Sequence, residues 1–163
     1  MLASATEGWS DLYVASAGAS AALAGLVFVA ASINVERILS YAGLPERTLV
    51  TVLLLLGVVI VSLLGLVPGQ SDDALGIELL VEALLLTVAV TLLTLRARTG
   101  PEEESHLRSA AAIAAMGTLP FVVGAVLVLA GDEDGLYWTF GGMVGALIGG
   151  VVNAWVLLIE ILR

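Results

Sequence analysis

Five apolar stretches, each about as long as a lipid bilayer is thick, follow one another along this chain of 163 residues. A helix needs about 20 consecutive apolar residues to cross the hydrocarbon core of a bilayer. The predicted spans cover residues 12–35, 48–67, 74–95, 109–130 and 136–162. We therefore predict an all-α membrane protein, with residues 1–163 forming a single transmembrane domain of five helices.

Short turns rich in glycine, proline and acidic residues separate the spans. They lie at residues 42–45, 68–73, 99–101 and 131–135. Such residues are typical of helix ends and turns. Because these connections are short, consecutive helices are predicted to run antiparallel, and no segment is long enough for a separate soluble domain.

The composition supports a membrane protein and excludes several kinds of chemistry. Hydrophobic residues make up 60% of the chain and charged residues 13%, whereas a soluble domain carries about 25% charged residues. The chain has no cysteine, no lysine and one histidine, His106. These absences exclude thiol chemistry, a lysine Schiff base and a histidine-rich metal site within one chain.

Other classes of function are also not expected. The net charge of −9 argues against a nucleic-acid partner, because a phosphate backbone is bound through lysine and arginine. The chain contains no recognisable hydrolase, metalloprotease or nucleotide-binding motif. We expect neither enzymatic activity nor a cofactor, and the lipid bilayer is the one partner that the composition requires.

The arginines predict the orientation of the spans. All basic residues flank the first and third loops or end the chain, at Arg37, Arg47, Arg96, Arg98, Arg108 and Arg163. Arginine accumulates on the cytoplasmic side of membrane proteins. The N-terminus is therefore predicted outside and the C-terminus inside. Trp9, Tyr13, Tyr137 and Trp138 would then form an outer aromatic belt.

The same orientation places most of the acids outside. They are Glu7, Asp11, Asp72, Asp73, Glu78, Glu82, Asp132, Glu133 and Asp134. One interpretation is a mouth that concentrates cations. The other is that acids, which influence insertion little, accumulate wherever arginine is excluded.

The first predicted helix carries small or polar residues on two opposite faces. One stripe consists of Asp11, Ala15, Gly18, Ala22, Gly25, Val29, Ser32 and Glu36, and the other of Tyr13, Ser16, Ser20, Leu23, Val27, Ala30 and Asn34. Small residues let membrane helices approach closely. This pattern predicts a helix surrounded by protein. It is either a central packing helix or one whose stripe lines a pore in an oligomer.

The last predicted helix contains consecutive G-x-x-x-G steps at Gly141, Gly145 and Gly149. Such steps indicate close contact with another helix of the same chain or of a neighbouring subunit. Asn153 follows on an adjacent stripe and is predicted to form a buried hydrogen bond between helices. It could instead be a pore or ligand group.

The second predicted helix has the plainest sequence. Its large aliphatic residues, at 53–56 and 58–61, are predicted to face lipid, and Gly57, Ser62 and Gly65 are predicted as its contact points.

Glu78 and Glu82 are the most unusual acids because they lie four residues apart on one face of a predicted span. Ionisable groups within a membrane usually face a cavity, a partner or an ion. We expect the two carboxylates to face a hydrated vestibule or an oligomer axis, where they bind a cation or share a proton. Asp72 or Asp11 could complete the oxygen ligands of a divalent ion. The alternative is that both acids lie among the lipid headgroups.

The whole chain resembles a family of small bacterial multi-pass membrane proteins. The resemblance is carried by residues 21–30 with Ser32-Ile33-Asn34, and by residues 66–70, 75–79, 135–138 and 153–163. Most members of this family are labelled uncharacterised, and some are labelled modulators of a membrane-anchored AAA protease. The resemblance implies an accessory role and a location in the bacterial inner membrane, and it implies no site residues.

Two functions follow from these patterns. The first is a homo-oligomeric pore, conducting cations, with an acidic outer mouth. The second is a non-conducting accessory protein that binds and modulates another membrane protein, such as a membrane protease. A pore requires that the polar stripes meet water at an axis, whereas an accessory protein requires that they meet another chain.

Overall fold

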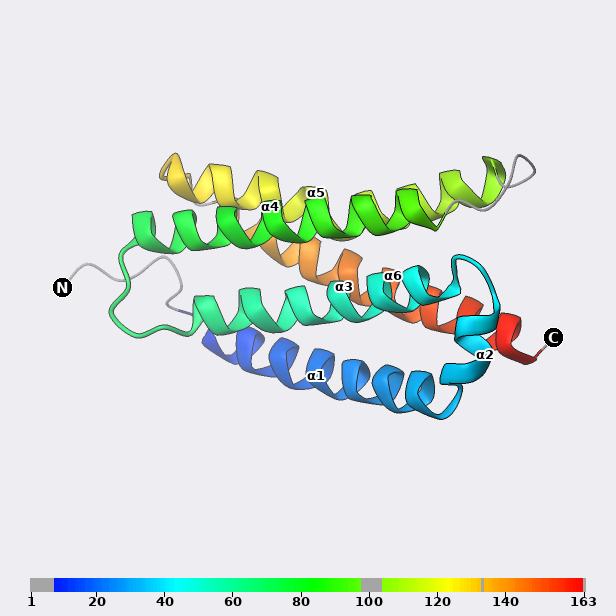
Figure 1. Ribbon diagram of the computed structural model, residues 1–163. Helices are drawn as coiled ribbons and strands as arrows, with labels where there is room; N and C mark the ends of the chain where they lie inside the picture. Colours follow the sequence, from blue (N-terminus) through cyan, green and yellow to red (C-terminus); the bar gives the residue numbers. More distant parts are fainter. Residues whose placement is uncertain (1–7, 98–103, 133, 163) are drawn as a thin grey trace.

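The structure is a computed structural model that describes residues 8–97, 104–132 and 134–162 (Figure 1). Its described residues form helices and turns without any strand. The helices are α1 (Ser10–Ile33), α2 (Val35–Ser40), α3 (Leu44–Gly65), α4 (Asp72–Arg96), α5 (Glu104–Leu129) and α6 (Gly135–Leu162). All but α2 include a segment long and apolar enough to cross a membrane. The prediction of an all-α protein with five such helices is confirmed.

The structure does not describe several charged residues of the chain. Glu7, Arg98, Glu102, Glu103, Glu133 and Arg163 lie outside the described residues, and so do the side chains of Glu104, His106, Arg108 and Glu160.

Helix boundaries differ from the predicted ones by a few residues, for local reasons. Helix α4 begins at Asp72 because the side chain of Ser71 accepts a hydrogen bond from the backbone N–H of Ala74, 3.3 Å away. Helix α3 begins at Leu44, after Gly43 in the left-handed conformation (φ 81°). The short helix α2 was not predicted; it forms because the backbone turns at Asn34, where α1 stops.

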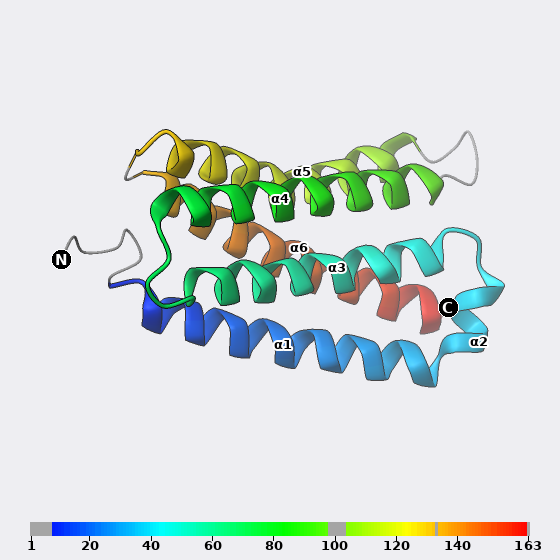
Figure 2. The ribbon, with the colours of Figure 1, turned by 60° about the vertical axis from the view of Figure 1, so that its left-hand side comes forward.

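Helices α3, α4, α5 and α6 form a four-helix bundle, and α1 lies outside it against α3 (Figures 1 and 2). In the bundle, α4 packs on α3 and α5, and α6 packs on α5 and α3. Helix α1 packs on α3 and scarcely touches α6. The loops α3–α4 and α5–α6 share one end, hereafter the Ser71 end. Helix α2 marks the opposite end, hereafter the α2 end.

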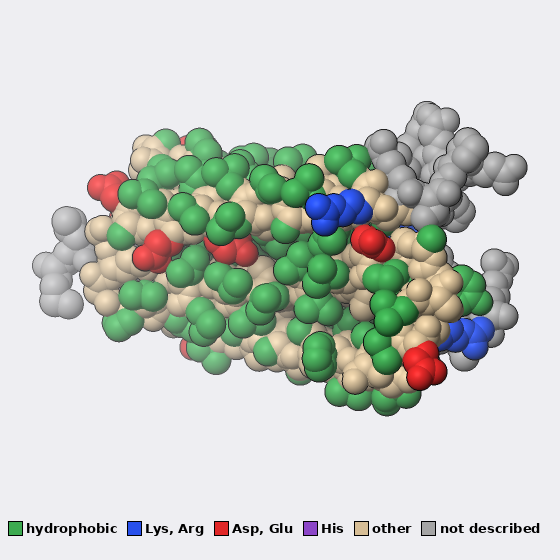
Figure 3. Space-filling model, viewed as in Figure 1, with side chains coloured by type: hydrophobic (Ala, Val, Ile, Leu, Met, Phe, Trp, Pro, Cys, Tyr) green, Lys and Arg blue, Asp and Glu red, His purple; other side chains and the backbone are tan. Residues whose placement is uncertain are grey.

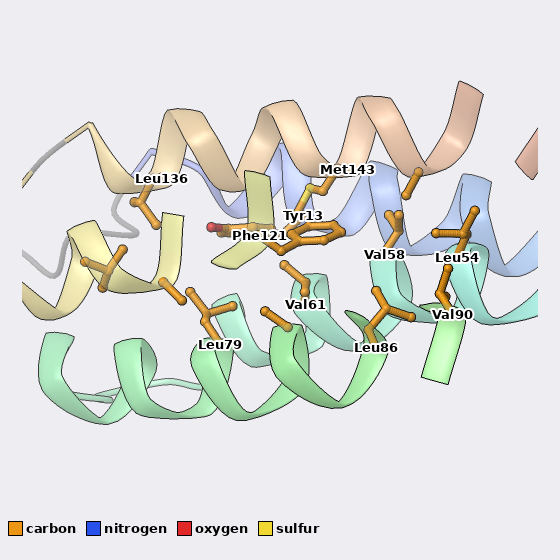
Figure 4. Packing of buried hydrophobic residues seen from close by; sticks show 14 of the residues in the cluster. Tyr13, Leu54, Val58, Val61, Leu79, Leu86, Val90, Phe121, Leu136 and Met143 are labelled. Carbon is orange, nitrogen blue, oxygen red and sulfur yellow. The ribbon is translucent and has the colours of Figure 1, made fainter. Parts of the chain in front are cut away.

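The middle of the bundle is filled by large apolar side chains from all four helices (Figure 4). Leu54, Val58 and Val61 of α3 are essentially inaccessible, and Phe121 of α5 and Met143 of α6 meet them from the other side. Burial of such side chains keeps α3 at the centre, since three other long helices contact it.

The predicted lipid-facing position of α3 is therefore wrong, and so is one of the two alternatives for α1. About half of the membrane-length segment of α3 is buried, although its aliphatic residues were predicted to face lipid. Only 6% of that of α1 is buried, so α1 is not a central packing helix within one chain, and contact of its stripe with another subunit stays a prediction. The reason is that bulky residues fill a bundle interior as well as they contact lipid. Small residues on α1 permit a close contact but do not place that contact within the chain.

One of the two stripes on α1 holds that helix to the bundle. Ser20 is buried, and its Oγ donates a hydrogen bond to the carbonyl oxygen of Leu55 on α3 at 2.7 Å. Tyr13 is also buried, and its ring lies where a side chain at Gly65 would be. Tyr13 therefore belongs to the core, unlike the exposed Tyr137 and Trp138 of the predicted aromatic belt.

Candidate functional site

Acidic and basic side chains gather at opposite ends of the bundle. Among the described residues, Arg37, Arg47 and Arg96 lie on α2, at the start of α3 and at the end of α4, all at the α2 end. Most of the described acids lie at or toward the Ser71 end: Asp11, Asp72, Asp73, Glu78, Glu82, Asp132 and Asp134. The acids that the sequence analysis predicted to lie on one side of the membrane are therefore found at one end of the bundle, where they come from four different helix ends.

Glu82 is the one acid among them that is drawn into the bundle. Its side chain is half-buried, and its Oε2 atom is fully buried without a hydrogen-bond partner among the described residues. It lies against α3, because a Cβ atom placed on Gly57 would be 3.4 Å from Oε1 of Glu82. Glycine at position 57 thus leaves the space that the Glu82 and Leu86 side chains occupy.

The depth of Glu82 makes this arrangement energetically unusual. It lies ten residues after the first residue of α4, so about 15 Å along the axis at 1.5 Å per residue. An acidic residue at the centre of a span costs about 2.5–3.5 kcal/mol on insertion scales. A carboxyl group in this position, with one oxygen unpartnered, is suited to holding a proton or a cation.

Glu78 lies one turn nearer the Ser71 end and is exposed. Its Oε2 accepts a hydrogen bond of 2.6 Å from Nε2 of Gln70, in the loop before α4. Acidic side chains are visible along the seam between α4 and α3, surrounded by hydrophobic ones (Figure 3). The two carboxylates thus lie one helical turn apart on α4, with Glu78 at the surface and Glu82 partly buried.

A preformed divalent-ion site is not assembled in the described part of the chain. No group of three or more Asp, Glu or His side chains there is close enough to hold a metal ion. Asp11 and Asp72 are both exposed at the helix starts. The cation site of Glu78 and Glu82 completed by either residue therefore stays a prediction, which the described residues of one chain do not assemble by themselves.

The other stripe of α1 is exposed along its whole length. Gly18, Gly25, Ser32 and Glu36 are all exposed, and nothing in the described chain lies within 4 Å of a Cβ atom placed on either glycine. Asn34 belongs to the opposite stripe and donates through Nδ2 to the carbonyl oxygen of Ala30 at 2.8 Å. The exposed stripe, from Asp11 to Glu36, is called the small face of α1 below.

The glycines of α6 divide into two kinds. Gly145 and Gly149 are buried against α5, where added side chains would meet Met116 and Ile113. Gly141 is exposed with open space around it. Asn153 is half-buried and forms no side-chain hydrogen bond with the described residues, so its predicted bond between helices stays a prediction. Close packing at Gly145 and Gly149 therefore joins α6 to α5 of the same chain.

Gln70 is the site residue that sequence reasoning missed, because a loop glutamine carries no signal of the carboxylate that it will meet. Gly57 was recognised as a contact point, but not as the neighbour of Glu82. In comparisons with protein-family models, curated proteins and solved structures, no match to this chain was found.

Proposed function

We propose that the protein is the subunit of a homo-oligomeric membrane pore that conducts cations or protons through a mouth at the Ser71 end. The observation that carries this proposal is the half-buried carboxyl group of Glu82 with its unpartnered oxygen. A membrane protein retains such a group against its insertion cost where an ion or a proton compensates for it.

An oligomer enters the proposal because the bundle interior is occupied. Leu54, Val58 and Ala83 are each completely inaccessible in the core, so a path for ions is better placed between subunits than along the bundle axis. The small face of α1 supports such an assembly, since it presents glycines that no other described part of the chain covers.

Ion flux through liposomes that contain the purified protein tests the proposed function. Wild type should dissipate a cation or proton gradient, and Glu82→Gln should reduce the flux or change its selectivity, because the amide keeps the shape and removes the charge. Glu78→Gln should have a smaller effect, since Glu78 is exposed and already hydrogen-bonded to Gln70. Wild type that shows no flux under any ion gradient, pH or voltage would rule out the pore. Unchanged flux in both variants would retain the pore and remove these residues from it.

The second candidate is a non-conducting accessory protein, and the same small face of α1 favours it. A helix of another membrane protein could pack on this face as well as a second copy could. The mass and composition of the purified complex distinguish the two proposals. The pore requires a complex of identical chains that conducts ions, whereas the accessory protein requires a complex with a different chain and shows no ion flux.

We further propose that the Ser71 end faces outward across a bacterial inner membrane, because the described arginines lie at the α2 end. Cysteines introduced at the exposed residues Ser71 and Asp132 should react with an impermeant maleimide in intact cells. Cysteines at Ser40 and Ala42, which are equally exposed at the other end, should react only after permeabilisation. Gly135, at the start of α6 near Asp132, is not a suitable position for an introduced cysteine, because a Cβ atom there would overlap Val128. The reverse labelling pattern would invert the orientation.

A further inference from the structure

An apolar groove lies between α1, α3 and α6, toward the α2 end of the bundle. It has a volume of about 310 Å³ and is lined mainly by aliphatic side chains, among them Leu26 of α1, Leu55 of α3 and Val151 of α6. The groove exists because α1 and α6 both pack on α3 but scarcely on each other. Its volume is at the lower end of the range for ligand pockets, roughly 300–1,000 Å³.

The polar side chains that line the groove are already engaged within the chain. Nδ2 of Asn34 donates to the carbonyl oxygen of Ala30 at 2.8 Å, and Oγ1 of Thr48 donates to that of Leu44 at 2.9 Å. These donors are therefore satisfied without a ligand. Such an interior suits a hydrocarbon chain better than a polar molecule.

An exposed arginine is the neighbour in sequence of a residue that lines the α2 end of the groove. Ile38 of α2 lines the groove, and Arg37 precedes it with an exposed side chain. Asn34, Arg37 and Ile38 are related by the i, i+3 and i+4 spacing that places residues on one side of a helix. An arginine beside an apolar groove complements a phosphate whose acyl chain lies in that groove.

We propose that this groove binds one acyl chain of an anionic phospholipid from the bilayer leaflet at the α2 end, with the phosphate beside Arg37. The size favours a single chain over a protein helix, because a helix with its side chains is about 10–12 Å across. This site lies on the far side of α3 from the Glu78 and Glu82 seam, so it does not depend on the proposed pore.

Lipid retention by the purified full chain tests this site. The delipidated protein is titrated with phosphatidylglycerol or with phosphatidylcholine, and bound lipid is counted by native mass spectrometry. Wild type should retain one phosphatidylglycerol in preference to phosphatidylcholine. Arg37→Gln should weaken that preference about fivefold, since one basic residue near an anionic surface contributes about that much.

Two variants fill the groove from α6, Ala154→Phe and Val151→Trp, and either should reduce retention of both lipids. Ala112→Phe is the matched control, because Ala112 is exposed on α5 and does not line the groove. Equal retention by the filled variants and the control would overturn the proposal, and so would equal affinity of wild type for the two lipids.

A measurement on wild type covers the case in which both groove variants misfold. Phosphatidylglycerol with a photoreactive group in its acyl chain should crosslink to the segments of α1, α3 and α6 that line the groove, and excess unlabelled phosphatidylglycerol should compete. Crosslinks spread evenly over the exposed faces of α4 and α5 would show that lipid merely surrounds the protein, and the site would be abandoned.

Discussion

Replacing Gly145 with leucine should strongly destabilise the bundle, whereas the same replacement at Gly141, one turn earlier on α6, should be tolerated. A Cβ atom on Gly145 would overlap the carbonyl oxygen of Met116 on α5, which is backbone and has no side-chain freedom. Nothing lies within 4 Å of a Cβ atom on Gly141. Overpacking of a well-packed contact costs about 1–3 kcal/mol and occasionally more, and a leucine forced against backbone belongs at the upper end of that range.

The pair of variants is compared by yield of monodisperse protein and by loss of helical circular dichroism on titration with a denaturing detergent. Gly145→Leu should aggregate or unfold at much lower detergent concentration than wild type, and Gly141→Leu should follow wild type. Equal stability of the two variants would contradict the packing of α6 on α5. Preferential loss of the Gly141 variant would instead indicate that α6 contacts a neighbouring subunit there.

Gly25→Leu should abolish self-association and leave the subunit folded. Gly25 lies on the small face of α1, and the described chain leaves open space around it. Leucine also has a better intrinsic helix propensity than glycine, by about 0.8 kcal/mol, so folding should not suffer. In an oligomer joined through this face, however, the added side chain would hold the neighbouring backbone away.

Ala19→Leu is the matched control for this second experiment. Ala19 is exposed on the same helix, and six residues of about 100° each separate it from Gly25, which places it on a different face. The masses of wild type and both variants in nanodiscs decide the outcome. An oligomeric Gly25→Leu variant would remove α1 from the interface, and a monomeric wild type would refute the proposed assembly.

The carboxylates of Glu78 and Glu82 show how much of a site the spacing of residues alone predicts. The i, i+4 relation placed Glu78 and Glu82 on one face of a span, and the helix α4 that carries them forms as expected. The pattern did not distinguish their environments. Glu82 is drawn against α3 because Gly57 lies opposite it, and Glu78 stays exposed beside Gln70. Both neighbours come from other segments of the chain.

The glycines likewise show that a sequence pattern does not identify the contact partner of a residue. G-x-x-x-G steps indicate that a close contact exists, and Gly145 and Gly149 do make one. The partner helix depends on which surfaces meet after insertion. Gly141 begins the same pattern, and Gly18 and Gly25 belong to a stripe of small residues, yet all three have open space around them in the described chain.

The sequence by itself determined the number of apolar helices, their approximate limits and the separation of charge between the two ends. These properties depend on the composition of consecutive residues and on turn chemistry, which act locally. Only the tertiary structure decided that α3 is central and α1 peripheral, that Glu82 is half-buried, and that a groove opens between α1 and α6. The physical reason is that large aliphatic side chains are about equally stable in contact with lipid and in a bundle core. Hydropathy therefore does not reveal which helix becomes buried, and the mutual fit of side chains decides it.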